Sequence, residues 1–533
     1  MNHPQVPTGT PPATSDRSGG PHPGDRGSRE LEPHGRRGLH VRAALGGVLA
    51  ALAGLAAGSV AAALLGTRQT PVVAIGSAFI DRVPPWLKDL AISLFGTHDK
   101  TALRAGILIV LLALAALGGI LAVRRYAAGA AVVIVLAGIA VIAAATRPDS
   151  GQTGFVPSMV AGITALLLLR LFSNRLTELH NDDGVSRRGF LQLAGGVALG
   201  TVAIGALGKV AGGHRAAVAE ARDGLDIPKP PSLDPPAGVQ APGAVAWATP
   251  NDEFYRIDTA LSVPLITPAD WRLKIHGMVD REIELSFADL LKRPVVHKWV
   301  TLTCVSNEVG GDLIGNALWS GVLLKDLLAE AGPSKDADAI LSTSKDGFTA
   351  GTPLSTLTDN RESMLAFAIN GEPLPLEHGF PVRIVVPGLY GYVSATKWLT
   401  DIEVSRFDQF EAYWTPRGWD ELGPIKLSSR IDVPRSKASV GQVTVAGVAW
   451  DQHVGVSKVE VRVDGGAWQE ATLAADPSTD TWRQWHWTWN APRGNHVLQV
   501  RAFDAKGNPQ VESQAPPAPN GSTGLHSVDI KVG

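Results

Sequence analysis

Long apolar runs dominate the first 212 residues of the chain. Five of them follow one another, at about 43–66, 102–123, 127–146, 155–172 and 189–211. Each is close to the roughly 20 residues that an α-helix needs to cross a bilayer. The pattern therefore predicts a multi-span α-helical membrane region over residues 41–212, with about five transmembrane helices.

Arginines gather at alternate ends of these runs. They stand before the first run, between the second and third, and around the link between the fourth and fifth: Arg36, Arg37, Arg42, Arg124, Arg125, Arg170, Arg175, Arg187 and Arg188. Because cytoplasmic loops carry an excess of Lys and Arg, these segments are expected in the cytoplasm. With five spans, the chain from about residue 213 onward then lies on the extracytoplasmic side of the cell membrane.

The segment before the first run is rich in Pro, Gly, Ser and charged residues. Such a composition cannot bury enough apolar surface to offset chain entropy, so residues 1–40 are expected to form a disordered cytoplasmic tail. The formal net charge of the chain is −2, and no basic stripe with interleaved aromatic residues follows the membrane region. Nucleic acid is therefore not expected as a partner.

Residues 186–191 read "SRRGFL" and stand directly before the fifth run. The Ser, the paired Arg, the Phe and the Leu resemble a bacterial twin-arginine export signal in an internal position. The alternative is a plain topological anchor, since arginines beside a membrane helix are common. The twin-arginine route carries folded proteins, which is required when a cofactor is inserted in the cytoplasm. The soluble part should then hold such a cofactor.

About 290 residues follow a Pro-rich linker at 213–244. The last of them, 439–533, read as short strands, and Val459, Val461 and Val463 alternate with polar residues before an Asp-Gly-Gly turn. This alternation predicts an immunoglobulin-like β-sandwich. Its clustered tryptophans are expected in the core and at interfaces rather than around a cofactor.

One cysteine occurs in the whole chain, Cys304. It sits in "VTLTCVSNEVGG", where Val300, Leu302 and Cys304 alternate like a strand that ends in a Gly-rich turn. A single cysteine cannot form a disulfide within the chain. At a strand end it can be a nucleophile, a metal ligand or a buried small hydrophobe, and these residues alone leave the three open. A cysteine hydrolase would also need a base with an orienting carboxylate, which no motif supplies.

A succession of motifs follows Cys304: "NALWSGVLLKDLLAEAG", "DGFTAGTPL", "NGEPLPLEHGFPVRIVVPGLYGYVSATKWL" and "AYWTPRGW". From about residue 251 to the C-terminus the chain resembles the sulfite oxidase family of molybdopterin enzymes. The block "HGFPVRIVVPG" followed by "KW", about seventy-five residues after a solitary cysteine, is the most specific part. The resemblance implies an α+β molybdopterin-binding catalytic domain over 245–408, a connector over 409–438, and a final sandwich of the kind that forms homodimers in the family.

The resemblance also implies the site residues. In the family the cysteine binds molybdenum beside the dithiolene sulfurs of the pterin, which implies the metal-ligand and catalytic role for Cys304; a soft thiolate suits a high-valent metal. The other residues implied to contact the molybdenum–molybdopterin cofactor (Moco) are Asn251, Phe254, Tyr255, Arg256, His378, Arg383, Lys397 and Trp398. The planar, always charged fork of Arg383 suits the pterin phosphate. The histidine that many sulfite oxidases carry after the first segment is absent, and Asp258 and Thr259 stand there.

Two further departures concern the small-molecule substrate. Sulfite oxidases follow the cysteine with an Asn-Arg pair that helps bind the anion, whereas here Asn307 precedes Glu308, and the family arginine before "KW" is missing from "YGYVSATKW". An anion site loses its main attraction without these arginines. We therefore expect two-electron oxygen-atom transfer that favours the reduction of small S- or N-oxides. Sulfite oxidation with an external acceptor and a non-catalytic membrane-tethered binding protein are the alternatives.

No haem or flavin motif is visible in the chain. The predicted spans contain no histidine, and a single cysteine cannot attach a c-type haem. Electrons are therefore expected to pass to or from a separate partner protein or carrier.

Overall fold

The computed structural model describes residues 33–533 except 66, 68, 84–98, 148–152, 182–185, 212, 233, 236–237, 240 and 476. Residues 1–32, the main part of the predicted tail, lie outside the described residues. The first helix, α1, begins at Pro33, so residues 33–40 are helical and the expectation of disorder up to residue 40 is wrong at its end. These residues extend the apolar helix that follows, which explains the difference.

The membrane region is a bundle of helices: α1 (Pro33–Leu64), α2 (Pro71–Arg82), α4 (Asp99–Arg124), α5 (Tyr126–Ala145), α6 (Val156–Asn181) and α7 (Ser186–Ala211). Among the described residues, four helices are long and apolar enough to cross a membrane: Gly38–Leu64, Thr101–Arg124, Tyr126–Ala145 and Val156–Thr177. The described apolar part of α7, Gly189–Ala203, is shorter. A fifth span in α7 stays a prediction.

Small residues let the helices of the bundle approach one another closely. A Cβ added to Gly54 of α1 would lie 2.5 Å from the carbonyl oxygen of Ala161 in α6. A Cβ on Gly119 of α4 would lie 2.1 Å from the carbonyl oxygen of Ala43 in α1. Close contact through small residues is the usual way in which transmembrane helices pack. The helices of the bundle therefore approach one another through small residues, a mode of packing that is common in transmembrane helices.

A short helix, α8 (His214–Asp223), connects the bundle to the soluble part. It occupies the start of the predicted linker and packs on the catalytic domain, where Val218 is completely buried beside Leu374 and Leu376. Arg222 donates to the carbonyl oxygens of Pro373 at 2.6 Å and Leu374 at 2.9 Å. The linker therefore does not begin as a free spacer. Between Asp223 and the catalytic domain, the described residues have no regular secondary structure.

The catalytic domain contains one mixed sheet, one antiparallel sheet and a few short helices. The first sheet has the order β2-β1-β10-β5-β6, and the second runs β3-β4-β7-β8 with β9 also paired to β7. The strands are β1 (Arg272–Gly277), β2 (Ile283–Ser286), β3 (Val295–Thr303), β4 (Ile314–Leu323), β5 (Ala339–Ser344), β6 (Thr349–Pro353), β7 (Met364–Ile369), β8 (Glu372–Pro373), β9 (Arg383–Val385) and β10 (Leu399–Ser405). This mixture confirms the predicted α+β class.

The helices of this domain are short: α9 (Phe287–Leu291), α10 (Leu324–Ala331), α11 (Ser355–Thr358), η2 (Leu376–His378), η3 (Phe407–Gln409) and η4 (Thr415–Arg417). A capping box between Ser286 and Asp289 begins α9, and Gly332 in a left-handed conformation ends α10. Trp271, Leu327 and Leu328 are fully buried in the largest core cluster, which these elements share. The core holds both sheets in one domain.

The C-terminal part is a sandwich of two sheets, ordered β11-β13-β17-β16 and β12-β19-β18-β14-β15. Its strands are β11 (Ser428–Val433), β12 (Lys437–Ala438), β13 (Gly441–Trp450), β14 (Val456–Val463), β15 (Gln469–Glu470), β16 (Thr472–Leu473), β17 (Arg483–Ala491), β18 (Gly494–Asp504) and β19 (Ser527–Val532). The inward valines Val459 and Val461 are fully buried, as their alternation predicts. The sandwich prediction is confirmed, but its first strand lies inside the expected connector.

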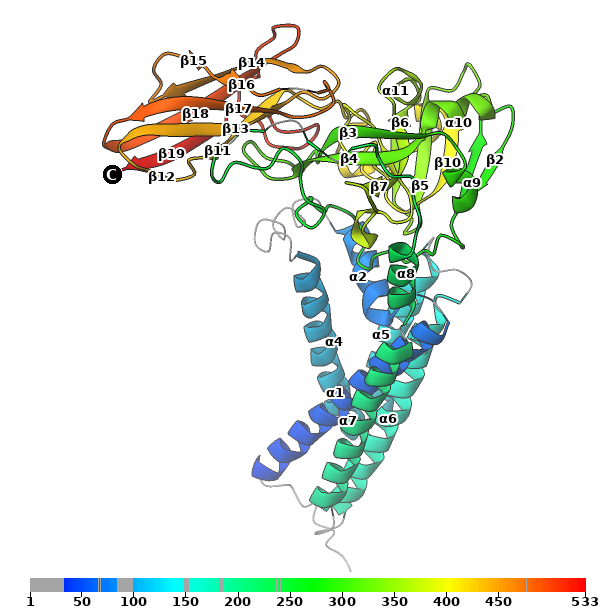
Figure 1. Ribbon diagram of the computed structural model, residues 1–533. Coiled ribbons are helices and arrows are strands. Elements are labelled where there is room, and N and C mark those ends of the chain that lie inside the picture. Colours follow the sequence, from blue (N-terminus) through cyan, green and yellow to red (C-terminus); the bar gives the residue numbers. More distant parts are fainter. Residues whose placement is uncertain are drawn as a thin grey trace, which may run out of the picture.

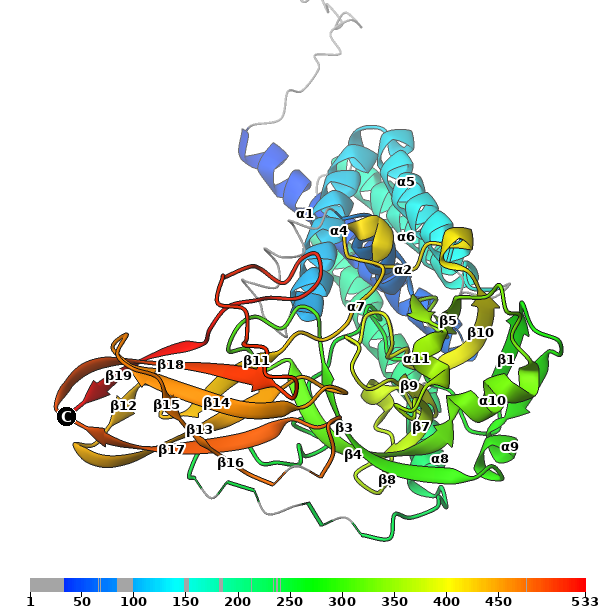
Figure 2. The ribbon, with the colours of Figure 1, turned by 90° about the horizontal axis from the view of Figure 1, so that it is seen from above.

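The tryptophans of the sandwich divide between its core and the domain boundary. Trp485 and Trp489 are buried in the sandwich core. Trp450 and Trp482 instead join the core cluster of the catalytic domain. Figure 1 shows the two soluble domains side by side above the helical bundle, and Figure 2 shows the sandwich projecting to one side of it. The two soluble domains are therefore packed together through a shared apolar boundary.

Candidate active site

Cys304 follows the last residue of β3. Strands β3 and β4 pair as an antiparallel hairpin in which Thr303 faces Ile314, so residues 304–313 form the connecting loop. The amide of Cys304 donates to the carbonyl oxygen of Leu313 at 3.0 Å, and its Sγ lies 2.9 Å from Oγ of Ser306. The residue is 8% exposed, and burial raises the pKa of the thiol. The predicted strand-end position of the only cysteine is confirmed.

A group of aromatic rings links the other predicted residues. Phe254 stacks on Tyr255 with ring centroids 5.3 Å apart and meets the ring of His378 edge-on at 5.7 Å. The ring of Trp319, from β4, meets Phe254 at 5.5 Å and carries the guanidinium of Arg383 5.1 Å from its centroid. Sequence reasoning missed Trp319. It lies in the quoted motif "NALWSG", but no spacing rule connects it to Phe254 or Arg383.

Tyr255 brings this aromatic group next to Cys304. Its phenol is close enough to interact electrostatically with both the thiol of Cys304 and the guanidinium of Arg383. Burial raises the pKa of Tyr255 above its usual range, and the nearby thiol adds to this effect. The phenol therefore keeps its proton at any physiological pH and can act as a hydrogen-bond donor.

Arg383 is a buried cation without a carboxylate partner among the described residues. It is 4% exposed and donates to the carbonyl oxygens of His378 at 3.2 Å, Ile384 at 3.4 Å and Ala395 at 3.4 Å. Burial lowers the pKa of Arg383 to about 10. An arginine buried in this way is stable only with strong acceptors nearby, and an anion would be the best of them.

His378 presents an unsatisfied polar atom. Its Nδ1 is buried and has no hydrogen-bond partner in the described part of the chain. Burial, aided by the positive charges of Lys397 and Arg383, lowers the pKa of His378 to about 3. The imidazole is therefore neutral, and its free nitrogen is available to a bound group.

Lys397 and Trp398 close this region from the chain segment before β10. Trp398 donates through Nε1 to the carbonyl oxygen of Leu376 at 2.8 Å. Lys397 donates through Nζ to the carbonyl oxygen of Glu377 at 3.1 Å and lies 3.4 Å from Oδ2 of Asp258. The structure therefore brings together the residues of the "HGFPVR" and "KW" motifs, as predicted.

Arg256 and Asn251 stand at the margin of the cluster. Arg256 is 40% exposed and pairs with Asp258 at 2.9 Å. Asn251 bonds to the β7–β8 turn, where its Oδ1 accepts from Asn370 at 2.8 Å and its Nδ2 donates to Glu372 at 3.2 Å. Its contacts show a structural role for Asn251 in that turn.

Comparison with known proteins agrees with this geometry. Residues 260–414 match the model of the oxidoreductase molybdopterin binding domain, and residues 428–500 match a bacterial Ig domain. An uncharacterized oxidoreductase, YuiH, of Bacillus subtilis is 35% identical over 153 residues, which are 29% of this chain and 74% of that protein. Mitochondrial sulfite oxidase of Mus musculus is 32% identical over 343 residues, 55% of this chain and 62% of the mouse enzyme.

The chain belongs to the sulfite oxidase family of molybdopterin oxidoreductases. Residues 260–414 thus match the molybdopterin-binding oxidoreductase domain that the motifs predicted. The chain spans about three fifths of the length of the mouse enzyme. Among solved structures, the sulfane dehydrogenase SoxCD of Paracoccus pantotrophus aligns over 54% of this chain and 82% of its own, with 23% identity and a TM-score of 0.48.

The cluster has the donors that a molybdopterin cofactor of this family requires. Among the described residues, Arg383 offers a buried guanidinium that donates to backbone carbonyls, and Nδ1 of His378 is buried without a hydrogen-bond partner. Cys304 supplies a thiol at the same site, within electrostatic range of Lys397 and Tyr255. These residues fit an anionic pterin with a soft metal at one end.

The substrate departures from the family also have a structural setting. Ser306 stands beside the thiol of Cys304. Ser394 lies in "YGYVSATKW", the segment that lacks the family arginine; it is fully buried and donates to the carbonyl oxygen of Tyr390 at 2.9 Å. Glu308 is exposed. Its charge is therefore screened by water, and it repels an anion at the site less than its position in the sequence implied.

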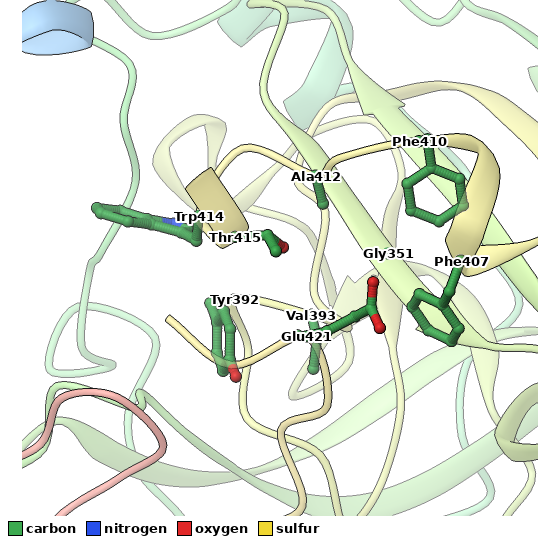
Figure 3. Close-up of a pocket in the computed structure, with 9 residues that line it drawn as sticks. All are labelled: Gly351, Tyr392, Val393, Phe407, Phe410, Ala412, Trp414, Thr415 and Glu421. Atoms are coloured by element: carbon green, nitrogen blue, oxygen red, sulfur yellow. The ribbon is translucent and has the colours of Figure 1, made fainter. Parts of the chain in front are cut away.

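A separate small hollow borders the segment that leads to Lys397 (Figure 3). It is lined by Gly351, Tyr392, Val393, Phe407, Phe410, Ala412, Trp414, Thr415 and Glu421. None of the residues predicted for the site lines it. The only signal in the sequence was the aromatic motif "AYWTPRGW". Burial raises the pKa of the Glu421 carboxyl, which lies among these rings.

Proposed function

We propose that this protein is a membrane-anchored molybdopterin enzyme that reduces small neutral S-oxides or N-oxides on the extracytoplasmic side of the cell membrane. The observation that carries the proposal is that hydroxyl groups lie beside the Cys304 thiol, while Lys397, a cation within its electrostatic range, is paired with Asp258. The hydrogen-bond partner of the thiol is the Ser306 hydroxyl, and the phenols of Tyr255 and Tyr390 lie within electrostatic range. A neutral substrate needs no counter-charge there.

The cations of the site have other partners. Arg383 is held by three backbone carbonyl oxygens, and Lys397 by the carboxylate of Asp258 and the carbonyl of Glu377. We assign both to the pterin and its phosphate, together with His378, Trp398 and Phe254. Arg256 would take part from the margin, whereas the contacts of Asn251 favour an indirect role. The substrate side is then left without a free arginine.

In this assignment Cys304 is the protein ligand of molybdenum. Moco, when bound, supplies two-electron oxygen-atom transfer. The raised pKa of the free thiol is no obstacle, because coordination to a metal replaces the proton of a cysteine. Ser306 can donate a hydrogen bond to the sulfur and so tune its donor strength.

The protein must also supply a hydrogen-bond donor for the departing oxygen. The overall reaction is R₂SO + 2 H⁺ + 2 e⁻ → R₂S + H₂O, so two protons must reach that oxygen. Tyr255 is protonated and its hydroxyl makes no hydrogen bond with the described residues. We assign it as the group that orients the substrate oxygen. An external electron donor completes the balance.

The placement in the cell rests on the predicted topology. In the described part of the chain, four helices are long and apolar enough to span a membrane. Arg147, just after α5, donates to the carbonyl oxygen of Asp346 in the catalytic domain at 3.1 Å. The domain would thus sit directly on the outer face of the bundle. Under the positive-inside rule and with α7 as a fifth span, that face is extracytoplasmic.

Elemental and pterin analysis of the full-length protein in detergent tests the proposal first. We expect about one molybdenum and one pterin per chain. With a reduced viologen as donor, S-oxide or N-oxide turnover should exceed sulfite oxidation measured with ferricyanide. If the protein instead oxidises sulfite with a micromolar Michaelis constant, the alternative function, sulfite oxidation, is established.

Replacement of Cys304 by serine tests the ligand assignment. A hydroxyl is a harder and poorer donor to molybdenum than a thiolate. We expect Cys304→Ser to keep the fold and the pterin but to lose activity and to change the molybdenum spectrum. Full activity in this variant would refute the assignment.

A further inference from the structure

Strand β3, which leads to Cys304, is bonded to the Ig-like sandwich as well as to its own sheet. The amide of Thr301 donates to the carbonyl oxygen of Asp480 at 2.9 Å, and Oγ1 of Thr301 accepts from the amide of Trp482 at 2.7 Å. Nε2 of Gln452 donates to the carbonyl oxygen of Thr301 at 3.1 Å and to Oγ1 of Thr303 at 2.9 Å. Figure 1 shows β3 and β4 extending toward the sandwich.

The loop that follows Cys304 has further bonds to the same domain. Nη1 of Arg430 donates to the carbonyl oxygen of Gly311 at 2.6 Å, and Oγ of Ser522 donates to the carbonyl oxygen of Asn307 at 2.7 Å. The sandwich therefore holds the backbone on both sides of the cysteine.

We propose that the Ig-like domain positions Cys304 for metal binding, and that Gln452 is the principal positioning residue. This inference rests on the proposed role of Cys304 as a molybdenum ligand. Gln452 reaches closer to the cysteine than the other sandwich contacts on β3, because Thr303 is the residue directly before Cys304.

The geometry of Gln452 supports this role. The side chain is 2% exposed, its amide nitrogen serves two acceptors on β3, and its Oε1 is buried without a partner among the described residues. A buried side-chain amide whose oxygen has no hydrogen-bond partner lowers the stability of the fold. We take its presence here as support for a role of the two hydrogen bonds that its nitrogen donates. The backbone beside it is fixed, since Gly455 donates to the carbonyl oxygen of Asp451 at 2.7 Å and His453 to that of Thr479 at 2.9 Å.

The mechanical reason is the position of the cysteine at the end of a hairpin. A strand end followed by a ten-residue loop opens more readily than the middle of a sheet. A metal ligand, by contrast, has to be held within a fraction of an ångström. Bonds from a second rigid domain to Thr301 and Thr303 remove that freedom.

The single cysteine of the chain allows a direct test. A thiol reagent such as dithiobis(nitrobenzoate) reports on Cys304 alone in full-length protein produced without pterin synthesis. We compare Gln452→Met with Gln484→Met. Gln484 is an equally buried glutamine of the sandwich that bonds to Val239 and Val245 instead of β3.

Loss of the Gln452 bonds should raise the thiol reaction rate of Cys304 roughly 5- to 30-fold, which corresponds to the loss of one or two hydrogen bonds. The Gln484→Met rate should stay within about twofold of wild type. In cofactor-loaded protein, Gln452→Met should keep its pterin but shift or broaden the molybdenum(V) paramagnetic resonance signal, whereas Gln484→Met should not.

Thr303→Val provides a second route if Gln452→Met does not fold. It removes Oγ1 of Thr303, one of the two acceptors of Gln452, so it should also raise the reaction rate of the Cys304 thiol. The double variant Gln452→Met/Thr303→Val should react little faster than the faster of the two single variants. Equal thiol rates in the two glutamine variants would overturn the inference. If Gln452→Met raises the thiol reaction rate of Cys304 but the wild-type protein never binds molybdenum, Gln452 still positions the cysteine, and the proposed function is refuted instead.

Discussion

The carboxylate of Asp258 lies 3.4 Å from the ammonium of Lys397, and their side chains are only 5% and 9% exposed. Asp258 stands where many sulfite oxidases have a histidine. In this chain the lysine of the "KW" motif is thus already paired with an acid from the segment that also carries Phe254 and Tyr255. The pair joins two predicted parts of the cofactor site, and Arg256 extends it by a 2.9 Å contact with Asp258.

Removal of Lys397 separates its structural role from its cofactor role. Lys397→Met removes the buried ammonium beside Asp258, but Arg256 still pairs with this carboxylate, so the variant should lose about 1–3 kcal/mol of folding free energy. We expect this variant to lose pterin as well. Lys397→Met/Asp258→Asn should regain most of the stability but none of the pterin. Denaturant titration and pterin fluorescence after release measure the two effects, and recovery of pterin in the double variant would mean that Lys397 does not bind the cofactor.

Glu308→Arg restores the Asn-Arg pair that sulfite oxidases carry after the cysteine. Because Glu308 is exposed, an arginine fits there without loss of packing. One charge-assisted hydrogen bond is worth about 1.5–3 kcal/mol, so the Michaelis constant for sulfite should fall about 10-fold or more, while that for an S-oxide should not change. Glu308→Gln is the matched control, since it removes the charge alone. If both variants behave alike, net charge and not a specific arginine contact governs anion binding.

The stability of the sandwich should depend on pH through Asp451. Burial, with Asp504 nearby, raises the pKa of Asp451 to about 7. The unfolded chain releases this proton near pH 4, so between about pH 4 and 7 the unfolded state binds fewer protons and stability falls as pH rises. Asp451→Asn should therefore match wild type near pH 4 and exceed it at pH 8 by about 2–4 kcal/mol. Thermal unfolding across this range is the measurement.

Asp504→Asn serves as the contrast for Asp451. Nδ2 of Asn508 donates to Oδ2 of Asp504 at 2.7 Å, and the backbone amides of Asn508 and Lys506 donate to its Oδ1 at 2.8 Å. Against the effect of burial, these bonds lower the pKa of the Asp504 carboxyl. Its replacement should destabilise the sandwich at neutral pH. A wild-type pH profile in Asp451→Asn would show that this carboxyl is ionised and solvated in the folded protein.

The twin-arginine hypothesis predicts a specific export defect. The side chains of Arg187 and Arg188 lie outside the described residues. Substitution of both by lysine keeps the charge that orients membrane helices but removes the export motif. We expect the catalytic domain to stay inside, so that protease added to spheroplasts does not cleave it. Normal cleavage in the double variant would indicate that the pair is only an anchor.

Local patterns predicted the fold well because each depends on a few neighbouring residues. Apolar runs indicated the four helices of the described residues that are long enough to span a membrane, and the alternation of Val459 and Val461 indicated the sandwich. The domain boundaries were less accurate, since Val218 of α8 and Trp450 are buried against residues far away in the sequence. Burial against a distant partner leaves no periodic signal in the chain.

The same distinction holds for the candidate site. Motifs indicated His378, Arg383 and Lys397, which the structure brings together. No sequence pattern indicated Trp319 or Gln452, because buried tryptophans and glutamines are common and only the tertiary structure shows what these two contact. The ion pair of Asp258 escaped for the same reason: the departure from the family was visible, but the lysine that it meets is 139 residues away.

Helix α8 has a consequence for how such an enzyme would meet its electron donor. It starts at His214, three positions after α7 ends at Ala211, and Arg215 is bonded to Glu377 at 2.6 Å, next to His378. Under the proposed topology the catalytic domain is therefore held close to the membrane surface and cannot move away from it. Encounters with a membrane-bound donor would become a search in two dimensions, and lateral diffusion within the membrane would limit how often electrons arrive.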